Sequence, residues 1–257
     1  MQRLSFACVL LTLVAVIPAW AQAENTLACD MPTDLTAPSS PLTRVAAALT
    51  AKRSLDILAL GSGSTVGESG GANGPALAFH TPEHSFPYRM VEALRSMKPS
   101  EKFNLTVAGG RSMTADAMLP ILRHQLATHH FDLVLWQTGT VEAVQGVRPD
   151  ALRSDLQDGA DAVEEAHADL VLIDPQFSRF LRANADLNPY ETVLSQMTST
   201  SAATLFHRFD LTQGWVNAGQ VDLERVSHEE RDKTIELLNN CLGQALARYV
   251  LAGAGER

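Results

Sequence analysis

A short turn rich in serine and glycine is the first candidate for chemistry. Residues 61–67 read Gly-Ser-Gly-Ser-Thr-Val-Gly and directly follow an apolar run, residues 55–60, that is typical of a buried strand. A serine at such a strand exit can attack an ester when a base lies within hydrogen-bond reach and donors stabilise the oxyanion. We therefore weigh Ser62 and Ser64 as nucleophiles with His228 as their base, against an alternative in which all three are ordinary turn or surface residues.

The glycine spacing of this turn argues against a nucleotide cofactor. The turn has the spacing G-x-G-x-x-x-G rather than G-x-G-x-x-G, and the chain contains no Gly-Lys-Ser/Thr sequence of a P-loop. His129 and His130 close an expected helix, where they complement its dipole. The sequence therefore predicts neither a cofactor nor a metal site.

Five apolar runs that alternate with helical periodicity must position this turn. Buried parallel strands read as continuous apolar runs, and alternating strands and helices build layered sheets. The sequence therefore predicts one domain, residues 42–257, with a three-layer α/β/α sandwich around a parallel sheet of about five strands, after an irregular tail at residues 24–41. The expected strands are 55–60, 104–108, 133–136, 170–173 and 204–206 with Phe209, and the expected helices are 42–51, 84–97, 114–128, 149–166 and about 227 or 231 to 251.

The loops at the carboxyl ends of these strands are the expected walls of a ligand crevice. In open α/β sheets, ligands bind outside the carboxyl ends of the strands, near the switch in strand order. That rule selects residues 61–74, 109–114, 137–142 and 174–188.

These loops, taken together, resemble the four blocks of the SGNH/GDSL hydrolase family. The first block is similar to residues 60–67, the second to Val107-Ala108-Gly109-Gly110-Arg111-Ser112, and the third to Trp136-Gln137-Thr138-Gly139-Thr140-Val141-Glu142-Ala143. Residues 205–242 are similar to the approach to the last block. The resemblance implies a flavodoxin-like sandwich and chemistry on O-acyl esters, as esterases or deacetylases perform it.

Several residues depart from what this resemblance implies. The nucleophilic serine of the family falls on Gly63, the oxyanion-binding asparagine falls on Val141, and the acid and histidine of the last block fall on Glu230 and Lys233. The oxyanion glycine of the second block is matched by Gly109 or Gly110.

Two hypotheses follow from these departures. In the first, the ordinary triad is lost and the protein binds an acylated glycan or a small ester without hydrolysing it. In the second, an active esterase, deacetylase or acyltransferase uses Ser62 or Ser64 with His228. The resemblance also suggests an envelope acyl-modification or polysaccharide-export assembly as the setting.

The amino terminus has the pattern of a secretory signal. Arg3 precedes an apolar run, residues 4–17, which is followed by Pro18 and the small-residue sequence Ala-Gln-Ala at 21–23. We expect a signal peptide at residues 1–23 and a periplasmic or secreted protein, with an N-terminal membrane anchor as the alternative. No later stretch is long and apolar enough to predict a membrane span.

Charge and cysteine content fit the same location. The chain has 29 acidic against 20 basic residues, a net charge of −9 that repels nucleic acid, so we expect no nucleic-acid partner. Removal of the signal would leave Cys29 and Cys241 as an even pair in an oxidising compartment. A disulfide between them is expected, and two separately buried thiols are the alternative.

Overall fold

A parallel sheet of five strands forms the centre of the protein. The computed structural model describes residues 29–68 and 82–256, so the signal expected at residues 1–23 lies outside the described residues. The strand order is β2-β1-β3-β4-β5 and all pairs are parallel, which confirms the flavodoxin-like sandwich. The strands are β1 (Leu55–Gly61), β2 (Phe103–Gly109), β3 (Leu133–Gln137), β4 (Asp169–Ile173) and β5 (Thr204–Phe206).

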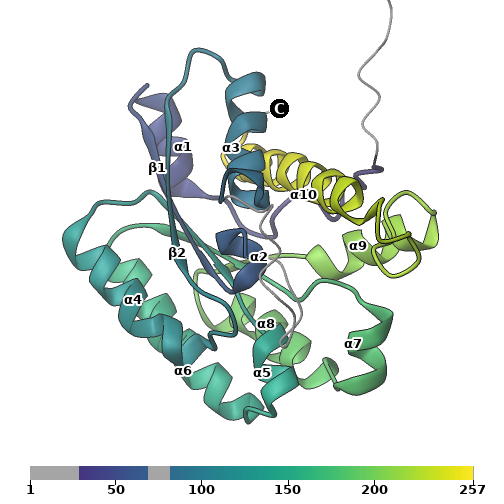
Figure 1. Ribbon diagram of the computed structural model, residues 1–257. Helices are drawn as coiled ribbons and strands as arrows, with labels where there is room; N and C mark the ends of the chain where they lie inside the picture. Colours follow the sequence, from purple (N-terminus) through teal and green to yellow (C-terminus); the bar gives the residue numbers. More distant parts are fainter. Residues whose placement is uncertain (1–28, 69–81, 257) are drawn as a thin grey trace, which may run out of the picture.

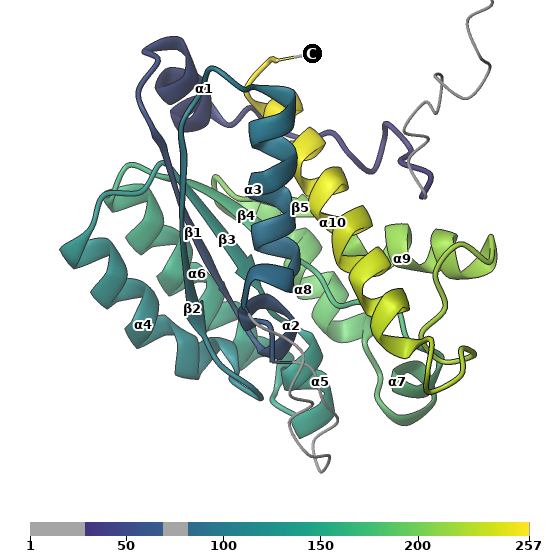
Figure 2. The same cartoon turned by 45° about the horizontal axis from the view of Figure 1, so that its top comes forward.

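Helices cover both faces of this sheet, as Figures 1 and 2 show. Alternate residues of β1 serve the two faces: Ile57 belongs to one apolar cluster, and Leu58 and Leu60 belong to the other. A strand buried on both faces has no polar side, which explains the apolar sequence of β1 after the half-buried Asp56. One face is covered by α1 (Thr43–Thr50), α3 (Phe86–Met97) and α10 (Arg231–Gly253), and the other by α4 (Ala115–Thr128), α6 (Pro149–Glu165) and α8 (Asn188–Thr200).

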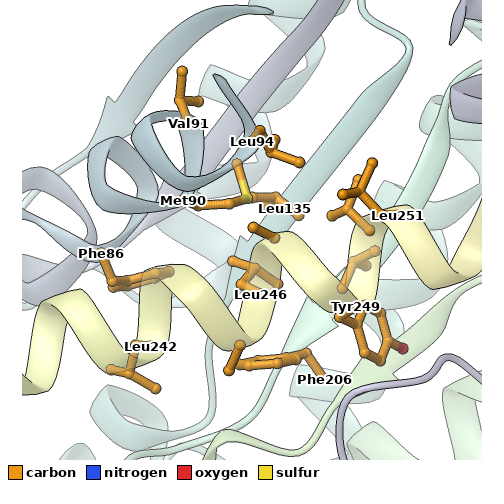
Figure 3. Packing of buried hydrophobic residues seen from close by; sticks show 14 of the residues in the cluster. Phe86, Met90, Val91, Leu94, Leu135, Phe206, Leu242, Leu246, Tyr249 and Leu251 are labelled. Carbon is orange, nitrogen blue, oxygen red and sulfur yellow. The ribbon is translucent and has the colours of Figure 1, made fainter. Parts of the chain in front are cut away.

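The closest helix packing joins α3 and α10. Phe86 and Met90 of α3 meet Leu246 of α10 in the apolar layer drawn in Figure 3. Gly243 permits this approach, because a Cβ atom there would lie 2.5 Å from the Cβ of Arg89. The last helix is therefore held along its length, and its N-terminal end is carried to the carboxyl edge of the sheet.

The structure contains helices that the sequence analysis placed in loops. Phe209, grouped with the fifth strand, lies in a helix instead; that expectation was wrong because an aromatic residue next to a strand has no distinctive periodicity. The long loop expected at 174–188 contains a short helix. The additional helices are α2 (Gly63–Val66), α5 (Thr140–Gln145), α7 (Arg179–Asn184), α8 and α9 (Arg208–Asn217), with a 3₁₀ turn at Pro82–His84. No described helix has both the length and the apolar character that a membrane span needs.

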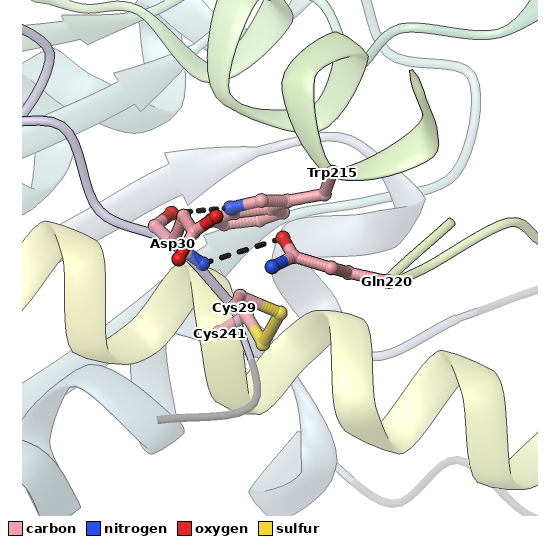
Figure 4. Close-up of a disulfide and its surroundings, with 5 residues drawn as sticks. All are labelled: Cys29, Asp30, Trp215, Gln220 and Cys241. Carbon is pink, nitrogen blue, oxygen red and sulfur yellow. Dashed lines mark hydrogen bonds between the residues drawn. A yellow bond between two sulfur atoms is a disulfide. The ribbon is translucent and has the colours of Figure 1, made fainter. Parts of the chain in front are cut away.

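A disulfide fixes the N-terminal segment to the last helix. Cys29 and Cys241 are bonded, with their Cα atoms 5.9 Å apart, which confirms the expected bridge (Figure 4). Trp215 donates its indole N–H to the carbonyl of Asp30, and the Asp30 amide donates to Gln220 Oε1 at 3.3 Å. The irregular segment before α1 is thereby attached to both α9 and α10.

Candidate functional site

The switch in strand order places the serine-rich turn at the centre of the carboxyl edge. β1 pairs with β2 on one side and with β3 on the other, so the chain leaves β1 at the point where the strand order reverses. Ser62 is the N-cap residue of α2, and Gln137 is the last residue of β3. The crevice expected at this switch point is therefore flanked by these two residues.

Gln137 accepts hydrogen bonds from several groups of the turn. Its Oε1 lies 3.3 Å from both the amide nitrogen and the hydroxyl of Ser62, and 3.0 Å from the Thr65 hydroxyl. The Ser64 hydroxyl is 3.5 Å from the same oxygen. A carboxamide oxygen accepts hydrogen bonds but is no base, so this network holds the serines without activating them.

Gly63, where the resemblance predicts the nucleophile, has no room for a side chain. A Cβ atom there would lie 2.6 Å from the carbonyl oxygen of Glu68. The Glu68 amide donates to the Gly63 carbonyl at 2.8 Å, so the chain closes back over the start of α2. A serine at this position would require the backbone at Glu68 to move.

The second block lies beside this turn, and its glycines contact the backbone of Gly61. Gly109 pairs with Gly61 and has φ of 112°; a Cβ atom there would lie 2.0 Å from the Gly61 carbonyl oxygen. The amide of Gly110 donates to that same oxygen at 3.2 Å. Glycine is therefore required at 109, and the Gly110 amide is engaged by the protein itself.

The third block is organised by Glu142, which sequence reasoning missed. Its buried carboxylate accepts hydrogen bonds of 2.7 Å from the Ala115 amide, the Thr138 hydroxyl and the Gly139 amide. It thus joins the first turn of α4 to the first turn of α5. Val141, half-buried beside it, has an apolar side chain and cannot replace the oxyanion donor.

The residues matched to the last block are exposed at the N-terminal end of α10. His228, Glu230 and Lys233 all point to solvent, and Glu230 accepts a hydrogen bond from the Ser227 hydroxyl at 3.0 Å. Over the described residues, no hydrogen bond joins His228 to Ser62 or Ser64. The serine–histidine pair weighed above is therefore not assembled in this conformation.

Arg208 is a second residue that the sequence analysis overlooked, and it lies on the β4–β5 side of the crevice. Its side chain is 2% exposed, with its guanidinium 5.2 Å from the centre of the Phe86 ring. Nη1 donates to the Ser64 hydroxyl at 3.3 Å, and Nη2 donates to Oε1 of Gln176. Burial lowers the pKa of Arg208 to about 10, partly opposed by Asp174, so it still carries its charge at neutral pH.

Asp174 follows β4 and is itself buried. Its carboxylate accepts a 2.8 Å hydrogen bond from the Phe209 amide. Burial holds the pKa of Asp174 well above the usual range, although that bond and the charge of Arg208 act in the opposite direction. Asp174 makes no ion pair within 4.0 Å of the Arg208 guanidinium, and the hydrogen bond of its carboxylate is to the Phe209 amide.

A cavity of about 450 Å³ opens next to Gln176. Its apolar walls come from α7, α9, α10 and the segment before α10, and Phe180 at its edge is 73% exposed. Within residues 29–68 and 82–256, no group of three or more histidine, cysteine or acidic side chains could hold a metal ion. The apolar lining is formed by Phe177, Phe180, Val216, Val221, Leu223, Val226 and Leu238.

Comparison with known proteins identifies relatives of this architecture. The sequence profile of the Non-GDSL lipase-like family matches residues 28–256. A search of curated proteins finds no match. Among solved structures, LAE5, an α/β hydrolase enzyme from the metagenome of Lake Arreo, Spain, is 15% identical with a TM-score of 0.58, and the match covers 78% of this chain and 95% of that one.

Two esterase structures show the same fold. AlinE4, an SGNH-hydrolase family esterase, is 17% identical with a TM-score of 0.51, over 76% of this chain and 97% of that one. A two-domain esterase, CEX, active on acetylated mannans, is 12% identical with a TM-score of 0.57, over 84% of this chain and 57% of that one. Together with the sheet topology, these likenesses confirm the expected fold. The profile match over residues 28–256 confirms the resemblance to this hydrolase family that the four sequence blocks predicted.

Proposed function

Since the chain belongs to the Non-GDSL lipase-like family, we propose that it binds an ester-bearing ligand at the carboxyl edge of its sheet without hydrolysing it. The observation that carries this proposal is at Gly63. The residue has no side chain, and the Glu68 carbonyl oxygen lies 2.6 Å from the position that a Cβ atom would take. A position closed by backbone cannot supply the nucleophile of an acyl transfer.

The remaining parts of the site support this conclusion. Acyl transfer needs a nucleophile, a base within hydrogen-bond reach and donors for the oxyanion. The hydroxyls of Ser62 and Ser64 contact Gln137, and His228 is exposed to solvent. Backbone donors alone leave only a small part of the usual acceleration.

We further propose that the ligand is an acylated glycan and that the protein is exported to the periplasm or secreted, within an envelope acyl-modification or polysaccharide-export assembly. The Cys29–Cys241 disulfide supports export, since such bonds persist in oxidising compartments. The esterase CEX, whose fold is similar, is active on acetylated mannans, which makes acetylated mannan fragments a suitable first ligand.

The experiment measures turnover and binding separately. Hydrolysis of p-nitrophenyl acetate by the mature protein should equal the buffer rate and should not change in Ser62→Ala, Ser64→Ala or His228→Ala. Calorimetric titration should show binding of acetylated mannan oligosaccharides and none of the same oligosaccharides after chemical deacetylation. Labelling of Ser62 or Ser64 by a fluorophosphonate, abolished in His228→Ala, would overturn the proposal in favour of the displaced pair.

Restoring the family residues tests the same conclusion from the other direction. Gly63→Ser alone should remain inactive, because Glu68 blocks the new side chain and Lys233 stands where the family has its base. A protonated lysine cannot accept the serine proton near neutral pH. Efficient hydrolysis by Gly63→Ser alone would contradict the proposal. The hydrolysis rate of Gly63→Ser is compared with that of the triple variant Gly63→Ser, Val141→Asn and Lys233→His, which restores the family residues at all three positions.

A further inference from the structure

Arg208 is a buried cation whose hydrogen-bond partners are neutral. Its guanidinium contacts the Ser64 hydroxyl and the Gln176 carboxamide, and one face lies toward the Phe86 ring. Its Nε is buried and makes no hydrogen bond within the described part of the chain. Over the same residues, no carboxylate lies within 4.0 Å of this guanidinium, whereas other arginines such as Arg53 and Arg179 have such a partner.

Burial of such a cation is unfavourable unless an anion compensates it. Asp174 is the acid that raises the pKa of Arg208, but the burial of Asp174 raises its own pKa and so favours its neutral form. The aromatic ring of Phe86 offsets only part of the cost. A guanidinium also presents a planar set of donors that suits the two oxygens of a carboxylate. An anionic ligand would supply the contact that no carboxylate of the described residues makes with Arg208.

An anion could approach Arg208 through the cavity beside Gln176, because Gln176 contacts Arg208 and also lines this cavity. Gln176 is half-buried and has Arg208 on one side and the cavity of about 450 Å³ on the other. The two acids at the cavity wall are occupied: Asp222 pairs with Arg179, and Glu224 accepts hydrogen bonds from the backbone amides of α7. A ligand would meet the apolar side chains of the wall together with Arg231, Ser178 and Thr212, and Arg208 lies behind the neutral amide of Gln176.

We propose that this cavity binds an aliphatic carboxylate, whose head group replaces the Gln176 oxygen at Arg208 and whose chain lies against the apolar wall. This goes beyond the proposed function, because an ester lacks the free carboxylate that Arg208 would recognise. Fluctuation of the Gln176 side chain is sufficient to admit the head group. Neutral compounds of the same length lack the charge and should bind far more weakly.

The test is a calorimetric titration of the mature protein at pH 7.5 with octanoate, octan-1-ol and acetate. Octanoate should bind at least ten times more tightly than octan-1-ol, since only the carboxylate compensates Arg208, and more tightly than acetate, since only its chain fills the cavity. Arg208→Gln should weaken octanoate binding at least tenfold. Arg123→Gln, which removes a surface cation paired with Asp158 on the α4–α6 face, is the matched control and should bind as wild type.

A second variant keeps the test decisive if Arg208→Gln does not fold. Val226 is only half-buried and lines the cavity, so Val226→Trp should fill the cavity without disturbing the core. It should weaken octanoate binding and abolish the difference between octanoate and acetate. Equal binding of octanoate and octan-1-ol, or wild-type binding by both variants, would overturn the inference.

The outcome is independent of the ester experiment. Octanoate titration requires no turnover, so a protein that hydrolyses esters yet binds octanoate through Arg208 would refute the proposed function alone. A protein without esterase activity that ignores octanoate would refute only the carboxylate site.

Discussion

The two halves of the carboxyl edge differ in how their buried polar groups are hydrogen-bonded. In the half formed by β1 and β3, Gln137 and Glu142 accept hydrogen bonds from backbone amides and hydroxyls of the surrounding loops. In the half formed by β4 and β5, the buried Nε–H of Arg208 has no hydrogen-bond partner among residues 29–68 and 82–256, and Gln176 separates the guanidinium from a cavity. The first half is closed by its own contacts, and the second is left to be completed by a ligand.

This difference separates scaffold from binding surface. Buried polar groups are nearly always hydrogen-bonded, so a satisfied network indicates a structural role and an unsatisfied buried donor requires an explanation. In the half formed by β1 and β3, the polar groups of the turn are hydrogen-bonded to Gln137. The loss of the nucleophile that we propose at Gly63 would accompany a turn closed by the backbone of Glu68.

Among the variants of the β1–β3 half of the edge, removal of the Glu142 carboxylate should lower the free energy of unfolding the most. Glu142→Ala leaves the Ala115 and Gly139 amides and the Thr138 hydroxyl without their acceptor, and hydrogen bonds to charged groups contribute about 1.5–3 kcal/mol each. Since these losses are partly relieved by water, we expect a decrease of about 4 kcal/mol in the free energy of unfolding, measured in urea. Glu164→Ala, on the exposed face of α6, should change it by less than about 0.5 kcal/mol. A cost below about 1 kcal/mol at Glu142 would remove its structural role.

A methyl group at position 63 tests how tightly the turn is closed. Gly63→Ala should cost about 2 kcal/mol, because its Cβ would contact the backbone oxygen of Glu68 rather than a flexible side chain. Gly214→Ala is the matched control: it lies inside α9, a Cβ there meets nothing within 4 Å, and helix propensity predicts a gain of about 0.8 kcal/mol. Equal effects of the two alanines on urea unfolding would mean that the turn is open and could accept a nucleophile.

The sequence was sufficient for the sheet because its central strands β1, β3 and β4 are almost entirely buried, although the edge strand β2 is largely half-buried. Runs such as residues 133–136 have one physical explanation, and the predicted strands match the observed ones closely. Short helices escaped prediction, since α2 and α5 have four and six residues and no measurable periodicity. The missed α8 did carry a signal: Tyr190, Val193, Leu194 and Met197 are buried at helical spacing.

Site residues could be predicted from the sequence only where their role depends on one short segment of the chain. Gly63 could be singled out from the first block alone, because a nucleophile needs a side chain, and its assignment to the nucleophile position stays a prediction. Glu142 and Arg208 were missed because their roles depend on partners far along the chain, such as Ala115 and Ser64. The closure at Glu68 was equally hidden, because it concerns a backbone oxygen, which every residue has.

Two arginine sites sharpen the comparison between a cation that pairs with a carboxylate and one that does not. Arg208→Met should raise the free energy of unfolding by about 1 kcal/mol without ligand, because it removes a buried cation that no carboxylate of the described residues contacts. Arg53→Met should lower it by about 2 kcal/mol, because it leaves the buried carboxylate of Asp132 without its ion pair, although the half-exposed position of Arg53 moderates the loss. Thermal unfolding of both variants at neutral pH measures the contrast. Destabilisation by Arg208→Met as large as that by Arg53→Met would show that Arg208 is structurally compensated.

The smallest expected effect on stability concerns Glu224, which lines the cavity in the β4–β5 half of the edge and accepts hydrogen bonds from the start of α7. Burial opposes ionisation of Glu224, but hydrogen bonds from the Phe180 amide, the Ser178 hydroxyl and the Arg179 amide outweigh it, so its pKa is lowered. A lowered folded-state pKa stabilises the protein above the unfolded value of about 4.3, and this contribution is lost as the pH falls through the folded pKa. Glu224→Gln should therefore cost about 0.5 kcal/mol at pH 7, and the difference from wild type should shrink on acidification to pH 3, as urea unfolding at both pH values would measure. Glu229→Gln, on the exposed segment before α10, is the control for replacing a carboxylate by an amide at pH 7. If the cost of Glu224→Gln is the same at both pH values, the charge of this carboxylate does not hold α7, and the cavity wall depends on the Arg179–Asp222 pair instead.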